Sequence, residues 1–496
     1  MHSSNNLLIS SIYNVRNNLN ELVAEGENNM KYELSPMTRL KLMTTTPVIK
    51  QLFNIFPYLP EKSIISLVRM LYGKNGYPAG QKFIEKALAS LKLIFKNANP
   101  NCKKAIINNM VVNEGIYGQQ LRTLVTKNVG FDIPTLLVVS PTQRCPLKCY
   151  GCYSAEHAKH EDLKYAAFDS LVRQAKEMGI YFFVITGGEP YIYNHMFDIF
   201  EKHSDVYFQT YTSATTFTKG NHVKRLAELG NVLPCISVEG FEEETDKRRG
   251  KGHFKHILAA MASLREHGVP FGFSATATRE NNDKLMSDEF VDFYVKQGCC
   301  LGYYFQYMPI GRSPDFNLVP TPEQRIFRYQ RILKLRETKP ILFADFWCDG
   351  PLVGGCLAGG RRYLHINNLG NVEPCVFSQA YDMNIYDNSL LDILKNSKLF
   401  RAIRKRQPYS DNLLRPCMII DVPEVWRDAL LESQAKLSHQ TADNVAKELK
   451  VKIDQFAKDY AQLADPIWEK EYKKHYEKEN DYVREMRKIF DEQPAS

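Results

Sequence analysis

Short apolar runs alternate with stretches of helical periodicity through the middle of the chain. The runs are rich in β-branched and aromatic residues and occupy 134–140, 180–186, 206–212, 231–238, 269–277 and 301–308. Strands that are apolar on both faces are typical of a parallel sheet covered by helices. Because parallel crossovers are right-handed, these consecutive strand–helix units predict an α/β fold, a partial (βα)6 barrel with its chemistry at the carboxyl ends of the strands.

Three further regions surround the barrel, which is expected over 131–320. Apolar residues at helical spacing predict a helical N-terminal region over 1–130. Residues 321–420 are rich in cysteine and glycine with little periodicity, so metal ligation is expected to replace part of an apolar core there. Residues 421–496 predict C-terminal helices, one of which is expected to start at the Asp-Pro pair 465–466.

Composition indicates a compact protein with a sizeable core. Of 496 residues, 44% are hydrophobic and 24% are charged, which excludes a wholly disordered chain. No apolar run approaches the roughly 18 residues of a membrane-spanning helix, so a cytoplasmic location is expected. The formal net charge of +8 fits anionic small molecules, nucleic acid or acidic lipid head groups without selecting among them. Lysines among the N-terminal apolar residues allow peripheral membrane contact or ordinary helix packing, and no nucleic-acid partner is expected.

Three cysteines lie in a loop directly after the first apolar run. Cys145, Cys149 and Cys152 have the spacing C-x3-C-x2-C within CPLKCYGC. The chain has 11 cysteines, an odd number, and no export signal, which favours metal or redox chemistry over a disulfide framework. A four-iron cluster normally takes four cysteines, so three in one loop would leave one iron open. Structural zinc, with His157 or His160 as the fourth ligand, is the alternative.

Together with the motifs that follow it, this loop resembles the radical S-adenosylmethionine (SAM) superfamily. C-x3-C-x2-C after the first strand is that family's signature and implies a SAM-binding [4Fe-4S] cluster. TGGEP at the end of the second strand resembles the family's GGE motif, which holds the amino group of SAM. The residues to which this resemblance assigns the role are Gly187, Gly188, Glu189 and Pro190.

Two further segments fall where this family places its SAM contacts. ISVEG, after the fourth apolar run, resembles the element that contacts the ribose, which implies roles for Ser237 and Glu239. DKRRG resembles the segment whose arginine pairs with the SAM carboxylate, which implies this role for Arg249.

Two positions depart from the family's pattern. Gly151 stands where relatives usually carry an aromatic residue against the adenine, and Tyr150 or Tyr153 is expected to substitute for it. TSAT at 212–215 replaces the Thr-Asn-Gly-Thr of many relatives.

The resemblance also implies a reaction. The reduced cluster gives one electron to SAM, whose cleavage yields a 5′-deoxyadenosyl radical that abstracts hydrogen from an unreactive C–H. A reducing partner such as ferredoxin or flavodoxin is implied, and no catalytic residues are expected beyond the cluster and SAM ligands.

A second cysteine group lies near the end of the chain. Cys356, Gly370 and Cys375 form C-x13-G-x4-C, which resembles the first half of the SPASM and twitch modules that hold auxiliary iron–sulfur clusters. The resemblance implies a second [4Fe-4S] cluster, and its ligands are expected to be Cys348, Cys356, Cys375 and Cys417. If one of these is unbound, the auxiliary iron is expected to contact substrate instead. The remaining cysteines are interpreted as core or unassigned residues: Cys102, Cys235, Cys299 and Cys300.

The substrate is the least constrained part of the prediction. The stretch from about 110 to 425 resembles the tetraether and membrane-spanning lipid synthases, which implies C–C coupling or modification of lipid chains, with a lipid or small-molecule substrate. A peptide-modifying maturase is the alternative within the family, although such enzymes usually begin with a small winged-helix domain. An alternative of another class is a non-catalytic metal-binding scaffold.

Overall fold

In the computed structural model, the described residues are 47, 51, 78–157, 160–218, 220–439 and 442–476. The helices predicted before residue 78 and after residue 476 therefore lie outside the described residues, apart from 47 and 51. None of the described helices is both long and apolar enough to span a bilayer.

A single sheet of nine strands forms the wall of the barrel, in the order β7-β6-β5-β4-β3-β2-β1-β8-β9. The six predicted strands are all present: β1 (Leu137–Val139), β2 (Phe182–Ile185), β3 (Tyr207–Thr212), β4 (Val232–Val238), β5 (Gly272–Ala277) and β6 (Leu301–Gln306). Each pairs in parallel with its neighbour, so that Val138 of β1, for example, lies opposite Val184 of β2. The predicted α/β fold and its strand order are confirmed.

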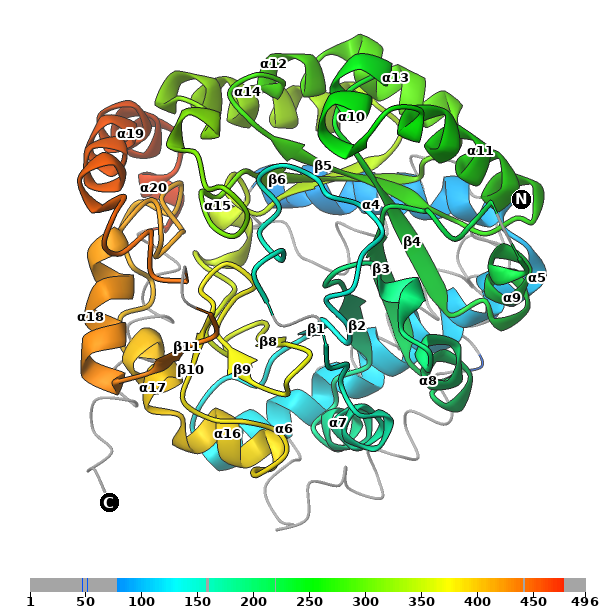
Figure 1. The fold of residues 1–496 in the computed structure, drawn as a ribbon, viewed down its shortest axis with the longest axis horizontal. Coiled ribbons are helices and arrows are strands. Elements are labelled where there is room, and N and C mark those ends of the chain that lie inside the picture. The colour runs from blue at the N-terminus through cyan, green and yellow to red at the C-terminus, as the bar shows by residue number, and fades with distance from the viewer. Residues whose placement is uncertain are drawn as a thin grey trace, which may run out of the picture.

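Helices surround this sheet on its outer side, as Figure 1 shows. They are α7 (Tyr165–Glu177), α8 (Met196–Lys202), α9 (His222–Leu229), α10 (Glu242–Arg249), α11 (His253–Glu266), α12 (Asn282–Leu285), α13 (Asp288–Lys296) and α14 (Pro322–Thr338). Side-chain caps fix where two of these helices begin. Ser287 accepts from the Phe290 amide at the start of α13, and Thr321 with Gln324 forms a capping box at the start of α14.

The sheet continues beyond the six predicted strands. β7 (Leu342–Asp345) extends it in parallel beside β6, while β8 (His365–Ile366) pairs in parallel with β1 and β9 (Val372–Glu373) runs antiparallel to β8. The helix before β7, α14, lacks a regular apolar pattern in the sequence because its buried face includes arginines. Arg325, Arg328 and Arg336 are at most 3% exposed. Buried carboxylates neutralise them, which is the condition for placing charge in a core.

The part of the chain that precedes β1 is helical as far as it is described. It comprises α4 (Pro78–Asn97), α5 (Pro100–Ala105), the π-helix η2 (Ile106–Gly118) and α6 (Gln119–Val129). α4 lies against α14 and β7, and α5 lies against α9. These helices cover the outside of the barrel, so the ordinary packing interpretation accounts for their apolar residues within 78–129.

The short helix α15 (Gly350–Val353) lies between β7 and β8. Five helices and two short strands of the described chain follow β9: β10 (Ala380–Tyr381), α16 (Leu390–Asn396), α17 (Lys398–Arg404), α18 (Pro423–Ser433), β11 (Lys436–Leu437), α19 (Lys450–Glu471) and α20 (Lys473–Tyr476). The predicted helix start at 465–466 is wrong, because α19 passes through Pro466. Asp465 accepts a hydrogen bond from Asn412 Nδ2 at 2.7 Å instead of capping, and a stripe that includes Phe456, Tyr460 and Trp468 keeps the helix packed on the body.

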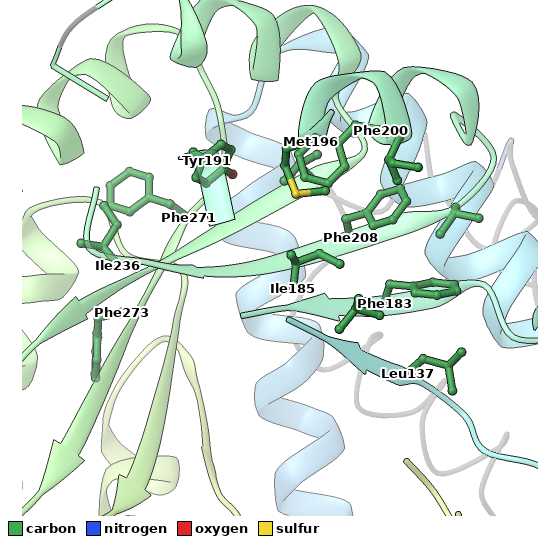
Figure 2. Close-up of a cluster of buried hydrophobic side chains, with 14 of the residues drawn as sticks. Leu137, Phe183, Ile185, Tyr191, Met196, Phe200, Phe208, Ile236, Phe271 and Phe273 are labelled. Carbon is green, nitrogen blue, oxygen red and sulfur yellow. The ribbon is translucent and has the colours of Figure 1, made fainter. Parts of the chain in front are cut away.

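Aromatic side chains fill the core between the sheet and α8 (Figure 2). Phe208 of β3 lies between Phe183 of β2, at 5.8 Å between ring centroids, and Phe200 of α8, at 4.9 Å. All three rings are fully buried. Truncating such a ring to alanine typically costs about 3–5 kcal/mol, so this layer contributes strongly to the stability of the barrel.

Candidate active site

A cavity of about 280 Å³ lies inside the barrel and toward the carboxyl ends of its strands. Its lining combines strand residues with two loop systems, the 145–153 loop after β1 and the segments around 347–363, 375–377 and 416–419. Six cysteines line it: Cys145, Cys149, Cys152, Cys356, Cys375 and Cys417. Both predicted cysteine groups therefore face one shared space.

The first cysteine group sits where the fold places active sites. Burial raises the pKa of Cys145 to about 12, and Cys149 and Cys152 are close enough to add to this rise. Burial also raises the pKa of Cys149, against the opposing charges of Arg249 and Arg248. Cys145 is exposed and Cys149 and Cys152 are half-buried, so the three thiols are accessible from the cavity. Thiols crowded in this way are ionised by a cationic partner, which an iron–sulfur centre supplies.

The zinc alternative finds no support in the described ranges. No three His, Cys, Asp or Glu side chains there form a set that could hold a single metal ion. His157 is buried with its ring 4.9 Å from that of His439, and His160 is exposed; neither lines the cavity. Thiols spread around a cavity suit a cluster of several irons better than one ion.

Gly187 and Gly188 bring the turn after β2 against the cysteine loop. A Cβ at Gly187 would lie 2.4 Å from the Thr142 carbonyl oxygen, and one at Gly188 would lie 2.2 Å from that of Arg144. Two hydrogen bonds hold this approach, from the Gly188 amide to Thr142 O at 2.9 Å and from the Glu189 amide to Arg144 O at 2.8 Å. Both glycines also line the cavity, so the turn at once shapes the cysteine loop and borders the ligand space.

Glu189 and Pro190 lie behind this turn and do not line the cavity. The Glu189 carboxylate is fully buried and accepts from Thr212 Oγ1 at 2.7 Å and from both the amide and the hydroxyl of Ser213. Burial raises its pKa, although these donors oppose the rise. Pro190 begins the 3-10 helix η3 (Pro190–Ile192). In this structure Glu189 ties the ends of β2 and β3 together, and the ligand contact that the resemblance implies for it stays a prediction.

Glu239, directly after β4, forms ion pairs with two arginines. Its fully buried carboxylate accepts from Arg248 Nη1 at 2.6 Å and from Arg249 Nη2 at 2.5 Å. Both arginines line the cavity, as does Ser237, and they are the only charged side chains among its described lining residues. Because two guanidinium groups share one carboxylate, the site retains positive charge suited to a carboxylate ligand such as that of SAM. Sequence reasoning named Arg249 and missed Arg248, although the two are adjacent in DKRRG.

The missing aromatic residue at position 151 has a structural substitute. Gly151 has φ +60°, and a Cβ there would lie 2.5 Å from Cε2 of Tyr307, which lines the cavity. Of the expected substitutes, Tyr150 lies beside Arg248, 6.0 Å from its guanidinium. Tyr153 is bound to Thr186 through its hydroxyl at 2.9 Å. Tyr153 and Tyr307 both line the cavity, so the expected role of Tyr153 stays a prediction. Tyr307, which follows β6, lies against Gly151, and no local sequence signal reveals this because it is 156 positions away.

The TSAT turn places an alanine where the backbone favours glycine. Ala214 stands at the third position and adopts φ +62°, in the left-handed region that favours glycine. Its amide donates to Thr212 Oγ1 at 2.9 Å, and Ser213 next to it lines the cavity. The departure therefore costs conformational strain and preserves the turn.

The second cysteine group surrounds Tyr363. Burial raises the pKa of this phenol, and the nearby Cys375, Cys356 and Cys417 add to the rise. The Tyr363 hydroxyl donates to Cys375 Sγ at 2.9 Å. Asp421, in an ion pair with Arg325, accepts from the Cys417 amide at 2.9 Å and anchors the last of these loops.

Cys348 does not join this group. It is buried in an apolar cluster, does not line the cavity, and has the Arg328–Asp345 ion pair as its nearest charges. Cys102, Cys235, Cys299 and Cys300 are buried in core clusters, as expected.

Comparison with known proteins matches two parts of the chain to family models. Residues 139–288 match the radical SAM superfamily, and residues 356–418 match the SPASM iron–sulfur cluster-binding domain. These matches contain the first cysteine loop and Cys356, Cys375 and Cys417, and they leave Cys348 outside.

Several curated proteins are similar over the same region. The mycofactocin maturase MftC of Mycobacterium tuberculosis is 29% identical over 300 residues, which cover 56% of this chain and 74% of that protein. An AdoMet-dependent heme synthase of Oleidesulfovibrio alaskensis is 24% identical over 55% of this chain and 78% of its own length. The PqqA peptide cyclase of Rhizobium meliloti is 25% identical over 57% and 79%. None of these is a lipid synthase, so the expected relationship to tetraether and membrane-spanning lipid synthases is not supported.

Solved structures show the same fold. The crystal structure of Streptococcus suis SuiB bound to S-adenosylmethionine has a TM-score of 0.51 and 19% identity, covering 61% of this chain and 77% of that chain. SuiB bound to precursor peptide SuiA has a TM-score of 0.52 and 18% identity, covering 66% and 81%. The chain therefore has the fold of these structures, with one segment that matches the radical SAM model and a later one that matches the SPASM model. It is an enzyme whose cofactors are S-adenosylmethionine, a SAM-binding [4Fe-4S] cluster and an auxiliary iron–sulfur centre.

Proposed function

We propose that this enzyme uses SAM to modify an unreactive carbon of an apolar or aromatic residue in a peptide substrate. The observation that carries the proposal is that both cysteine groups line the same cavity. The names of the maturase and cyclase relatives favour a peptide over other substrates.

The wall of the cavity suits such a residue. Aromatic rings form much of this wall. Between ring centroids, Tyr211 lies 5.8 Å from Tyr303 and 5.2 Å from Phe305. Phe305 stacks on Phe346 with a centroid distance of 5.3 Å. A few polar groups interrupt this apolar surface, among them Gln209, Ser237, Ser274 and Gln306. An apolar pocket with sparse polar groups binds an apolar group, orients it and excludes water.

The residues around the first cysteine group have separable roles. Cys145, Cys149 and Cys152 would hold the cluster, and when reduced this cluster supplies the electron that cleaves SAM and so makes hydrogen abstraction feasible. Arg248 and Arg249 would bind the SAM carboxylate while Glu239 fixes their orientation. A reducing protein such as ferredoxin or flavodoxin would deliver the electron.

A lipid-chain substrate is the second candidate, because the same apolar lining would accept an alkyl chain. One feature expected of many maturases is also missing from the described residues ahead of the barrel: residues 78–136 form helices and no strand, so they contain no winged-helix hairpin. The test must therefore compare the two substrate classes directly.

Deuterium transfer provides this comparison. The anaerobically reconstituted enzyme is given SAM, dithionite and one of two probes from bacteria grown in deuterated medium, a peptide pool or the polar lipid extract. We expect deuterium in the released 5′-deoxyadenosine with the peptides and not with the lipids. Cys145→Ala should release no 5′-deoxyadenosine, while Cys102→Ala, in the core, should behave like the natural enzyme.

The outcomes separate the candidates. Deuterium from the lipid extract alone would replace the peptide proposal with the lipid candidate. Release of 5′-deoxyadenosine without deuterium from either probe would contradict both substrate classes.

A further inference from the structure

The loop that follows β6 contacts the first cysteine loop through Arg312. The Arg312 amide donates to the Cys152 carbonyl oxygen at 3.0 Å, and Arg312 Nη1 donates to the carbonyl oxygen of Cys149 at 3.1 Å. Arg312 is half-buried and does not line the cavity. One residue behind the cavity wall therefore binds the backbone of two of the three cysteines that are expected to hold the SAM-binding cluster.

The backbone on both sides of Arg312 is held in an unusual conformation. Gly311 has φ +75°, and a Cβ there would lie 2.3 Å from the Cys152 carbonyl oxygen and 2.7 Å from that of Tyr153. Ser313 has φ +46°, in the left-handed region that favours glycine. Such strain persists only where the surrounding structure requires it, and it is concentrated at functional sites. The segment is therefore shaped to bring Arg312 against the cysteine loop.

The charge of Arg312 is not neutralised by a carboxylate. Arg144, at the start of the cysteine loop, forms an ion pair with Asp162, and the two arginines of DKRRG share one buried carboxylate. Arg312 forms no ion pair with any described residue, and its side chain donates its one hydrogen bond there to Cys149. Lys148 is also unpaired but is exposed, so water and salt screen its charge. Arg312 thus contributes a fixed positive charge beside this loop.

An iron–sulfur cluster responds to such a neighbour. Its reduction potential depends on the net charge around it and on hydrogen bonds. Reduction adds one electron, so a fixed positive charge nearby stabilises the reduced state. Groups that bind metal-ligating residues also fix the orientation of those residues, and replacing such a group typically costs about 10–100-fold in metal affinity or activity.

We propose that Arg312 is a positioning residue that fixes the Cys149–Cys152 segment and makes the cluster bound there easier to reduce. Its two hydrogen bonds hold the backbone of the ligands, and its guanidinium charge favours the added electron. The proposal does not depend on the identity of the substrate, so it stands or falls separately from the proposed function.

The reduction potential of the first cluster tests this role. The full-length enzyme is reconstituted anaerobically and titrated with dithionite, and the electron paramagnetic resonance (EPR) signal that changes on adding SAM is followed. Arg312→Gln removes the charge and should lower the ratio of reduced to oxidised cluster at a given potential about tenfold, which is about 59 mV for a one-electron couple. Arg312→Lys keeps the charge, and its potential should stay close to that of the natural enzyme.

Arg265→Gln is the matched control. Arg265 Nη1 likewise donates to a backbone carbonyl oxygen, that of Gln297 at 2.6 Å, and forms no ion pair with any described residue. It lies in the last turn of α11, which leads into β5, and so at the opposite end of the barrel from the cysteine loop. Its replacement should leave the potential and the iron content unchanged.

The outcomes distinguish this role from a merely structural one. An unchanged potential in R312Q would overturn the proposal, and so would loss of iron in both Arg312 variants without a shift in the potential of the remaining cluster. Equal shifts in R312Q and R312K would refute the role of charge. If R312Q does not fold, Arg312→Met takes its place, with the same expected shift and the same refuting result.

Discussion

Replacing Gly188 by alanine is expected to remove iron from the first cysteine group while leaving the auxiliary group loaded. The added Cβ would lie 2.2 Å from the Arg144 carbonyl oxygen and 2.7 Å from the Gln143 carbonyl carbon, whereas real Cβ contacts essentially never fall below 3.0 Å. These are backbone atoms and cannot rotate away. The cysteine loop therefore has to retreat by about 1 Å.

The cost follows from the contacts that this movement disturbs. Overpacking by one methyl group costs about 1–3 kcal/mol. The shift also strains the hydrogen bonds from Gly188 N to Thr142 O and from Glu189 N to Arg144 O, each worth about 1 kcal/mol net. We expect a total of about 2–5 kcal/mol against the native loop position. Because functional sites tolerate displacements of only about 0.5 Å, about four of eight irons should be lost.

The assay is iron and acid-labile sulfide per chain after anaerobic reconstitution, with EPR of the reduced protein with and without SAM. Gly252→Ala is the matched control. Its φ of +83° penalises alanine by about 1–2 kcal/mol, but no atom lies within 4 Å of the added Cβ. It should therefore destabilise the protein and keep all its iron. A Gly188→Ala protein with full iron and an unchanged response to SAM would refute the reasoning.

Three further predictions concern charge, strain and pH. Glu239→Gln leaves Arg248 and Arg249 without their shared buried carboxylate, so the free energy of unfolding in urea should fall by about 3–5 kcal/mol; an unchanged midpoint would contradict this. Ala214→Gly relieves a φ of +62° and should raise the free energy of unfolding by about 0.5–1 kcal/mol, where a loss would show that the turn is unstrained. Burial lowers the pKa of His157 to about 4, below the usual value for histidine of about 6.5. As the pH falls, the His157 imidazole is protonated in the unfolded chain before it is protonated in the folded chain. The free energy of unfolding should therefore fall by up to roughly 3 kcal/mol as the pH drops from about 6.5 to 4. Urea midpoints at pH 7.5 and 5.5 should differ less in His157→Asn, and an equal difference would exclude His157 as the cause.

Local pattern was enough for the barrel strands and the first cysteine loop. A strand buried on both faces has to be apolar along its length, and the ligands of one cluster can come from a single loop. Both features therefore depend on residues that are close together in the sequence. Cys145, Cys149, Cys152, Gly187, Gly188, Ser237 and Arg249 were all named from such motifs, and all line the cavity.

Local pattern failed where partners are distant in the chain. α14 buries arginines whose compensating carboxylates include Asp345 and Asp421, so its apolar face is interrupted. The start predicted at 465–466 was wrong for the same reason, because tertiary packing of α19 overrides a local stop signal.

By itself the sequence determined that this chain forms a parallel α/β barrel and carries two cysteine groups for iron–sulfur centres, because strand burial and loop ligation act over short stretches. Only the tertiary structure decided which side chains share the cavity. It added Arg248 and Tyr307 to the lining, buried Glu189 against Thr212 and Ser213, and left Cys348 in the core. The reason is that a cavity is made by segments that meet across the fold, and their meeting depends on the packing of the whole barrel.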